Sequence, residues 1–380
     1  MLQLKSLRVI VGRAIPPRNP HTSVTFKEYI MKVIIPLAGF GKRLRPHTYT
    51  KPKPLVNVAG KAVLGHILDK LQGLNVEEIV FIVGWLGEQI EAYVSANYEF
   101  KARYVEQKEL LGQAHAIRLA RDWVDGEVLI IFVDTIFEAD LARLTSLPSD
   151  GVIYVKEVDD PRRFGVVTLD DQGLITRFVE KPETPVSNLA VIGVYFCRDA
   201  PLLFECIDEL IEKGIQTKGE YFLADALQVM VDRGSRFNAW TVDVWEDCGT
   251  RDAVLQTNRY LLKQVPHANG EHTENSIVLP PVYIDPSARV VNSILGPHVH
   301  IGAGSVVIDS LVGPYVSLAE GSQVHTSIVK DTIINEESHI EEAMLSSSLV
   351  GRDALVRGTF ELLNVGDSSE IDSGQRLNQE

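Results

Sequence analysis

The chain has 380 residues, of which 45% are hydrophobic and 23% charged, and its formal net charge is −14 at pH 7. This composition is typical of a globular protein with room for two domains. It argues against a nucleic-acid partner, because proteins that neutralise phosphates carry an excess of Lys and Arg, and no apolar run reaches the roughly 20 residues needed to cross a membrane.

Residues 1–30 are basic, contain a single acid, and include a PPRNP turn cluster. Such a segment is compatible with a targeting sequence or with an unstructured extension upstream of a start at Met31. We favour the extension, because Met31 directly precedes the first clear strand.

Residues 31–265 are expected to form an α/β domain. Short apolar runs of strand length alternate with helical patterns, with strands at 32–38, 77–84, 128–134, 151–158 and 190–197 and helices at 62–74 and 112–124. This alternation predicts a Rossmann-like domain with a mainly parallel central sheet. In such sheets the ligand binds beyond the carboxyl ends of the strands.

From residue 276 the pattern changes, and apolar residues recur about every six positions. The sets are Leu295, Ile301 and Val307; Val312, Leu318 and Val324; Ile328, Ile334 and Ile340; and then Val350 and Val356. Gly, Ser, Asp and Asn fill the positions between them. This hexapeptide repeat predicts a left-handed parallel β-helix at 276–372, with 266–275 as a polar linker and 373–380 as a tail.

The three cysteines, Cys197, Cys206 and Cys248, are too few and too scattered for a disulfide framework or a zinc site. A protein without such a framework fits a reducing compartment. We therefore expect a cytoplasmic protein.

The loop after the first strand has the features of an anion site. The strand ends at Ala38, and Gly39 and Gly41 permit a tight turn with backbone amides open to a ligand. Five cations follow, namely Lys42, Arg43, Arg45, Lys51 and Lys53, and together they predict a polyphosphate site. The loop has neither the P-loop pattern nor the dinucleotide fingerprint, and a solvated basic loop is the alternative.

The run AGFGKRLRP followed by KPKPL resembles the signature of the sugar-1-phosphate nucleotidylyltransferases, in which a lysine follows an arginine by ten residues, here Lys53 and Arg43. The resemblance continues in order through LGQAHAI (111–117), FVDTIF (132–137), FGVV (164–167), VEKP (179–182), SNLAVIGVYFC (187–197), KGEYFLADAL (218–227) and WEDCGT (245–250). The most similar subgroup is the long form of glucose-1-phosphate thymidylyltransferase, which carries a β-helical tail.

The resemblance implies that a nucleoside triphosphate and a sugar-1-phosphate give an NDP-sugar and pyrophosphate with Mg²⁺, most specifically from dTTP and glucose-1-phosphate. The implied catalytic residues are Arg43, Lys53, Asp134 and Lys181, and the implied metal ligands are Asp134 and Asp247. The implied nucleotide-binding residues are Leu37, Ala38, Gly39, Gly41, Lys42, Gly112 and Gln113. The implied sugar-phosphate-binding residues are Gly165, Glu180, Lys181, Asn188, Glu220 and Trp245.

Taken singly, these residues have simpler interpretations: Asp134 as a helix N-cap, Asp247 as a turn residue, and Lys181 as a surface lysine. The sequence also departs from the family pattern at Phe40, Lys42, Val133 and Lys218. Phe40 and Val133 are expected to crowd the nucleotide. The nucleotide and the sugar therefore stay open: UTP, GTP and ATP are the alternatives to dTTP, and mannose and N-acetylglucosamine are the alternatives to glucose.

Two other functional classes are considered. The β-helix of a bifunctional enzyme would also transfer an acyl group, but His115, His298, His300 and His325 are better interpreted as polar corner or surface residues than as catalytic or metal-binding ones. A non-catalytic regulatory homologue would be expected to lose the charged residues, which are all present. A homo-oligomer is expected.

Overall fold

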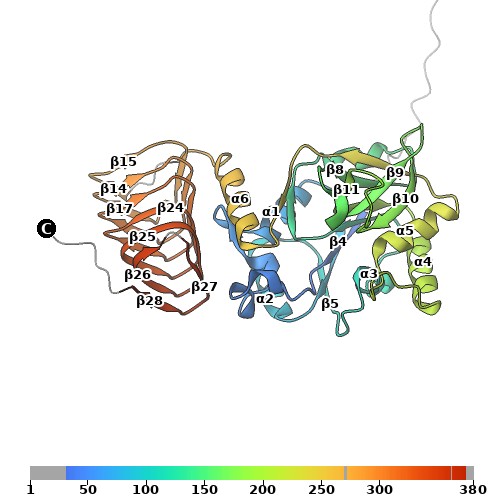
Figure 1. Ribbon diagram of the computed structural model, residues 1–380, viewed down its shortest axis with the longest axis horizontal. Coiled ribbons are helices and arrows are strands. Elements are labelled where there is room, and N and C mark those ends of the chain that lie inside the picture. The colour runs from blue at the N-terminus through green and yellow to red at the C-terminus, as the bar shows by residue number, and fades with distance from the viewer. Residues whose placement is uncertain (1–30, 269–271, 361, 374–380) are drawn as a thin grey trace, which may run out of the picture.

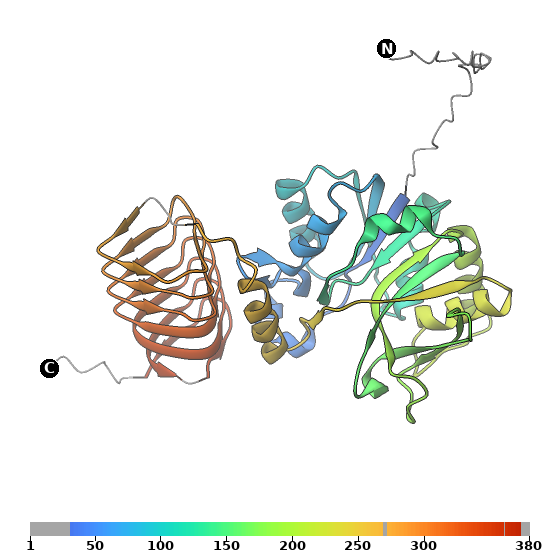
Figure 2. The same cartoon turned by 90° about the horizontal axis from the view of Figure 1, so that it is seen from above.

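The computed structural model describes residues 31–268, 272–360 and 362–373. The predicted extension, 1–30, lies outside the described residues, as does most of the predicted tail. The α/β domain and the β-helix lie side by side along the long axis of the molecule, with helix α6 (Arg251–Leu262) between them (Figures 1 and 2). No helix among the described residues is long and apolar enough to span a membrane.

The α/β domain is built on a nine-stranded sheet in the order β10-β9-β11-β6-β1-β4-β5, with β8 beside β11 and β12 beside β8. Strands β6, β1, β4 and β5 are parallel, as predicted. Strand β11 is antiparallel to β6, β8 and β9, and β9 and β10 form an antiparallel pair, so the sheet as a whole is mixed. A short turn is enough to join antiparallel neighbours, whereas parallel ones need a crossover.

The strand bounds in this sheet are β1 Met31–Pro36, β4 Val76–Val83, β5 Ala102–Glu106, β6 Val128–Ile131, β8 Gly151–Glu157, β9 Gly165–Leu169, β10 Ile175–Glu180, β11 Leu189–Cys197 and β12 Phe237–Thr241. Two small antiparallel pairs join β2 (Asn57–Val58) to β3 (Lys61–Ala62) and β7 (Thr135–Phe137) to β13 (Trp245–Asp247). The short 3-10 helices are η1 Lys42–Leu44, η2 His47–Tyr49, η3 Lys53–Leu55, η4 Arg121–Trp123, η5 Leu141–Ser146 and η6 Pro161–Arg163.

Helices cover both faces of the sheet. On one face, Val33 and Ile35 share a core with α1 (Val63–Leu71), α2 (Gly87–Asn97) and α6. On the other face, Ile34 packs with α3 (Gln113–Arg118), α4 (Ala200–Glu212) and α5 (Leu223–Asp232). Because neighbouring side chains of a strand point to opposite faces, a run that is apolar at every position marks a strand buried on both sides, and this is why the sequence pattern predicted β1 correctly.

The second domain is a parallel β-helix of 15 strands. Its strands are β14 His272–Glu274, β15 Ile277–Val278, β16 Val282–Ile284, β17 Arg289–Val291, β18 Ile294–Leu295, β19 Val299–Ile301, β20 Val306–Ile308, β21 Leu311–Val312, β22 Val316–Leu318, β23 Gln323–His325, β24 Ile328–Ile334, β25 His339–Val350, β26 Leu355–Phe360, β27 Asn364–Val365 and β28 Glu370–Asp372. Strand β14 already pairs with β17, so the ladder starts inside the segment predicted as a linker.

The first coils repeat at 17 residues and the later ones at 16 or 15, and serines stack at one corner. The Ser293 hydroxyl accepts from the Ser310 amide at 3.1 Å, and the Ser310 hydroxyl accepts from the Ser327 amide at 3.1 Å, each across 17 residues. The predicted repeat is thus confirmed, with one error of register. Ile328 is 39% exposed, whereas Val329 is fully buried, because Val329 stands opposite Val312 in the ladder and a shift of one residue moves a side chain to the other face.

Candidate active site

Two adjoining cavities lie at the carboxyl ends of the central strands. The first has a volume of about 540 Å³ and the second about 460 Å³. Arg43, Gln113, Phe132 and Asp134 line both cavities. A ligand in one cavity would therefore meet a ligand in the other at these four side chains.

The glycine-rich loop forms one wall of the second cavity. Its lining includes residues that the sequence analysis assigned to the nucleotide or to catalysis, namely Leu37, Ala38, Gly39, Gly41, Lys42, Arg43 and Lys53. Gly41 has φ +59°, and a Cβ there would lie 3.0 Å from Cβ of Lys53 and 3.1 Å from Cγ2 of Thr48. The absent side chain therefore lets the chain fold back and bring Lys53 beside the loop.

Three of the five predicted cations reach this cavity, and two do not. The Arg45 guanidinium stacks over the ring of Tyr49, 4.7 Å from its centroid, and the Lys51 ammonium binds Glu336 of the β-helix. Phe40 is 45% exposed and lines neither cavity, so of the two residues expected to crowd the nucleotide only Val133 lies in the wall.

Asp134 and Asp247 meet because two short strands pair. Asp134 lies in the turn between β6 and β7, and Asp247 is opposite Thr135 in the β7–β13 pair. The amide of Cys248 donates to the Asp134 carbonyl at 2.9 Å. Asp134 leads into a strand, so the helix N-cap interpretation is wrong. Oδ1 of Asp247 does accept from the Gly249 amide at 2.7 Å, as a turn residue would.

Two cations face these carboxylates. Nζ of Lys53 lies 3.7 Å from Oδ2 of Asp134. At Gly249, a Cβ would lie 2.8 Å from Nη2 of Arg43 and 2.8 Å from Oδ1 of Asp247, so the missing side chain leaves room for Arg43 to approach Asp247. Two cations and two carboxylates thus gather where the two cavities adjoin.

The carboxylate pair suits a hard divalent cation. Mg²⁺ is bound in proteins through one or two carboxylates, with substrate phosphates and water as the other ligands. The Asp134 side chain is half exposed, which leaves its oxygens accessible. Within the described parts of the chain no group of three or more His, Cys, Asp or Glu side chains could hold a metal, so the two aspartates are the candidate protein ligands.

Gly112 and Gln113 form the far wall of the second cavity, at the start of α3. Gly112 has φ +115°, and a Cβ there would lie 2.5 Å from the carbonyl oxygen of Tyr221. The amide of Ala114 donates to that same carbonyl at 2.9 Å. This close approach brings Glu220 into the second cavity. The predicted sugar-phosphate role would have placed it in the first cavity.

The first cavity is lined by four of the residues assigned to the sugar phosphate in the sequence analysis, namely Gly165, Glu180, Lys181 and Trp245. Glu180 stands opposite Gly165 in the β9–β10 pair, and a Cβ on Gly165 would lie 2.7 Å from Oε2 of Glu180. Nζ of Lys181 is 3.4 Å from Oε1 of Glu180. Burial raises the pKa of Glu180, although the Lys181 ammonium opposes this shift.

Lys181 has a backbone conformation that is rare for a side chain of its size. Its φ is +45°, and its amide donates to the Phe164 carbonyl at 3.0 Å. Nζ of Lys218 donates to the Lys181 carbonyl at 3.1 Å. Left-handed backbone at a non-glycine residue persists where surrounding contacts hold it, commonly at functional sites. The Lys181 side chain is 43% exposed, as the surface-lysine interpretation expects, and it also lines the first cavity.

One predicted residue lies outside both cavities, and several lining residues were not predicted. Asn188 is exposed and donates to Oε1 of Glu157 at 2.6 Å. It does not line the first cavity, because it precedes the part of β11 that does. Side chains missed by the sequence analysis include Arg163, Tyr195, Glu246 and Gln256. Arg163, Tyr195 and Glu246 lie within or beside the segments that resemble the family, so their place in the sequence could have identified them. Gln256 lies on α6, outside those segments, and nothing in the sequence marked it.

His115, His298 and His300 each contact a neighbouring side chain. Nδ1 of His115 contacts Nε2 of Gln107 at 3.2 Å. The His298 ring stacks on Tyr315 and the His300 ring on Tyr283, each with centroids 4.9 Å apart. These contacts agree with the structural interpretation of the repeat histidines.

Comparisons with known proteins point to one family. The family model described as "Nucleotidyl transferase" matches residues 32–264. The chain is 38% identical over 264 residues to the bifunctional protein GlmU of Methanocaldococcus jannaschii, covering 68% of this chain and 61% of that protein. It spans less than two thirds of the length of the first GlmU proteins that it matches.

Two further relatives carry the names of single activities. The chain is 34% identical over 222 residues to the UTP–glucose-1-phosphate uridylyltransferase AglF of Haloferax volcanii, covering 57% of this chain and 89% of that protein. It is 31% identical over 270 residues to a glucose-1-phosphate thymidylyltransferase of Streptomyces antibioticus, covering 68% of this chain and 74% of that protein. A solved UDP-glucose pyrophosphorylase shares the fold, with TM-score 0.56, 24% identity and coverage of 62% of this chain and 100% of that one.

Proposed function

We propose that this chain, which belongs to the nucleotidyl transferase family, joins a nucleoside triphosphate and a sugar-1-phosphate into an NDP-sugar and pyrophosphate. The observation that carries the proposal is the meeting of Arg43, Lys53, Asp134 and Asp247 at the boundary of two adjoining cavities. The relatives named for uridylyl and thymidylyl transfer to glucose-1-phosphate support the same activity.

The reaction brings two polyanions together. An oxygen of the sugar phosphate forms a bond to the α-phosphorus, the bond from that phosphorus to the bridging oxygen of the β-phosphate breaks, and pyrophosphate leaves. No side-chain nucleophile is required, so catalysis consists of positioning and electrostatic stabilisation. Arg43 and Lys53 suit the triphosphate in the second cavity, and Lys181 suits the attacking phosphate in the first.

Asp134 and Asp247 would hold Mg²⁺, which when bound neutralises phosphate charge and orients the reacting groups. Gln113 presents an amide that can pair with a base edge in the second cavity. Glu180 presents a carboxylate to sugar hydroxyls in the first cavity. Glu220 lies in the second cavity and suits the ribose of the nucleotide better than the sugar of the sugar-1-phosphate.

For the substrates, we propose dTTP and glucose-1-phosphate, with UTP as the alternative nucleotide. The thymidylyltransferase and uridylyltransferase relatives support these two pairs about equally.

We further propose a cytoplasmic homo-oligomer and a structural role for the β-helix. A second, acyl-transferring activity is not favoured, because His298 and His300 are stacked on tyrosines and their buried Nδ1 atoms have no hydrogen-bond partner among the described residues.

The test is pyrophosphate release with Mg²⁺ across a grid of five nucleoside triphosphates and five sugar-1-phosphates. Release with dTTP or UTP and glucose-1-phosphate is expected. Release only with GTP and mannose-1-phosphate, or only with ATP and glucose-1-phosphate, would keep the reaction and refute the proposed substrates. Folded protein that releases pyrophosphate from no pair would contradict the proposed activity and favour a regulatory homologue.

A further inference from the structure

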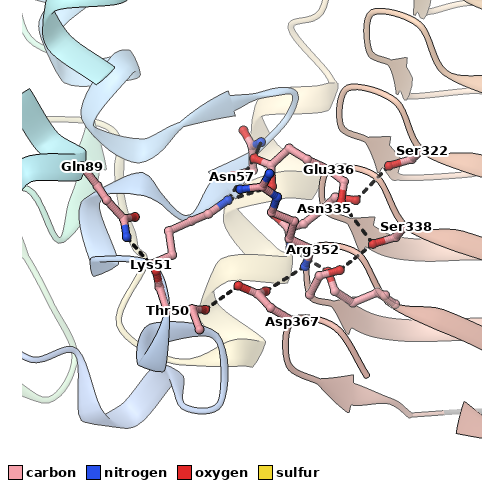
Figure 3. Close-up of polar contacts among 12 residues, drawn as sticks. Thr50, Lys51, Asn57, Gln89, Ser322, Asn335, Glu336, Ser338, Arg352 and Asp367 are labelled. Carbon is pink, nitrogen blue, oxygen red and sulfur yellow. Dashed lines mark hydrogen bonds and ion pairs between the residues drawn. The ribbon is translucent and has the colours of Figure 1, made fainter. Parts of the chain in front are cut away.

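A charged contact joins the two domains two residues before Lys53, which lines the second cavity. Nζ of Lys51 lies 2.9 and 2.8 Å from the two carboxylate oxygens of Glu336 in the β-helix, and Nδ2 of Asn57 donates to Oε1 at 3.3 Å (Figure 3). The Lys51 and Glu336 side chains are only 18% and 28% exposed. A pair so shielded is screened less by solvent and salt than a surface pair.

The residues around Lys51 are held from both sides. The Thr50 hydroxyl donates to the Asp367 carboxylate of the β-helix, while Nε2 of Gln89 from α2 donates to the Thr50 carbonyl at 2.9 Å (Figure 3). Nε2 of His47 lies 2.8 Å from Oδ1 of Asn364. The segment 47–57 is therefore clamped between the α/β domain and the β-helix.

This clamp is two residues away from Lys53. Pro52 stands between Lys51 and Lys53 with φ −64°, and a proline ring fixes that angle. The following turn is closed by the Leu55 amide, which donates to the Pro52 carbonyl at 2.9 Å, and by the Val56 amide, which donates to the Lys53 carbonyl at 3.1 Å. A stiff link of this kind transmits a displacement of Lys51 to Lys53.

We propose that Glu336 of the β-helix is a positioning residue for Lys53: by fixing Lys51, it sets the place of the Lys53 ammonium in the second cavity. The inference rests on the proposed function, because it assigns Lys53 to the nucleoside triphosphate. It gives the β-helix a part in substrate binding without a second active site. Glu336 touches no substrate in this arrangement and acts only through the chain segment that it holds.

The kinetic test uses the full chain with Glu336→Gln and Lys51→Met. Each variant removes one charge of the pair, so the KM for the nucleoside triphosphate is expected to rise at least about fivefold, the lower end of typical couplings between sites. The KM for the sugar-1-phosphate should stay unchanged, because Lys181 and Glu180 lie in the other cavity. The double variant should be no worse than either single one, since both remove the same contact.

Rescue separates positioning from general damage. Lys51→Arg keeps the charge and should stay close to the wild type in KM, and the reversed pair Lys51→Glu with Glu336→Lys should recover most of the loss. Glu341→Gln is the matched control. It breaks a carboxylate pair with Arg357, at 2.6 and 3.0 Å, whose partners both lie within the β-helix, and it should leave both KM values unchanged.

Hydrogen exchange gives a readout that needs no activity. The amides of Leu55 and Val56 should exchange faster in Glu336→Gln than in the wild type, and at the wild-type rate in Glu341→Gln. If the wild type releases no pyrophosphate from any substrate pair, the proposed function fails, and these exchange rates still test the positioning.

Two results would overturn the inference. One is a Glu336→Gln protein with wild-type exchange at Leu55 and Val56. The other is an active wild type whose Glu336→Gln variant has an unchanged KM for the nucleotide, or an equal rise in both KM values. If Glu336→Gln does not fold, the Lys51→Glu/Glu336→Lys protein is tested instead. It restores an ion pair, so a folded protein of this kind with a raised KM for the nucleotide would refute the role of the charge pair.

Discussion

The ammonium group of Lys53 lies 3.7 Å from Oδ2 of Asp134, and the two residues come from η3 and from the turn between β6 and β7. The Lys53 side chain is 15% exposed, while that of Asp134 is 50% exposed. A pair with one partner so open to solvent adds little to stability, about 1 kcal/mol or less. Its placement between two cavities is therefore better explained by chemistry than by folding.

The first prediction concerns Asp134. Asp134→Asn keeps the size of the side chain but removes the charge that would hold Mg²⁺ and face Lys53, so turnover should fall at least about a hundredfold. Steady-state pyrophosphate release measures this loss. Asp125→Asn, at a carboxylate that is 90% exposed and pairs only weakly with Lys32 at 3.4 Å, should be silent. Near-normal turnover in Asp134→Asn would count against the metal site.

The second prediction concerns the backbone contact at Gly112. In Gly112→Ala the new Cβ would collide with the Tyr221 backbone at 2.5 Å, at a φ of +115° that alanine rarely adopts. We expect a loss of about 1–3 kcal/mol in the free energy of unfolding and a raised KM for the nucleotide. Gly126→Ala, where a Cβ meets no atom within 4 Å, should be neutral in urea unfolding. Equal stability of the two variants would refute the close contact.

The third prediction concerns the pH dependence of Glu180. Burial raises its pKa above the ordinary 4.5, so the folded state binds the proton more tightly than the unfolded state. The contribution of Glu180 to stability is then present below pH 4.5 and is lost as pH rises through the folded-state pKa. Glu180→Gln carries no charge at any pH, so its urea midpoint should exceed that of the wild type at pH 7, and this difference should shrink toward pH 4.

The same substitution should impair function. A carboxylate that accepts from sugar hydroxyls is lost in Glu180→Gln, so we expect a higher KM for the sugar-1-phosphate and an unchanged KM for the nucleotide. Glu183→Gln, an exposed residue on the following loop, is the control for both measurements. A variant less stable than the wild type at pH 7 would show that Lys181 outweighs the burial of Glu180.

The fourth prediction tests the register of the β-helix. Val329 is fully buried and Ile328 is 39% exposed. Val329→Ala should cost about 1–3 kcal/mol of unfolding free energy, because it leaves a cavity in the core, whereas Ile328→Ala should stay within about 0.5 kcal/mol of the wild type. Urea unfolding of both variants is the measurement, and the reverse order of stabilities would restore the register expected from the sequence.

Local patterns in the sequence determined the two-domain architecture, the strand β1 and the loop Gly39–Arg43. The reason is that strand periodicity, a six-residue repeat and a glycine that permits positive φ each leave a signal within a few neighbouring residues. The same holds for Asp134 and Lys181, which stand next to apolar strands in recognisable segments. Their meeting at two cavities did not follow from the sequence, because Lys181 follows β10, which is antiparallel to β9, and the rule on carboxyl ends applies to parallel strands.

Only the tertiary structure decided which distant side chains meet. Lys51 was expected at the anion site, yet it pairs with Glu336, 285 residues away. Glu220 was expected beside the sugar, but it lines the second cavity, next to the contact of Gly112 with Tyr221. Gln256 reaches the first cavity because α6 packs between the domains. Such pairings depend on how whole elements dock, and the free energy of docking is spread over buried contacts that leave no mark at any single position of the sequence.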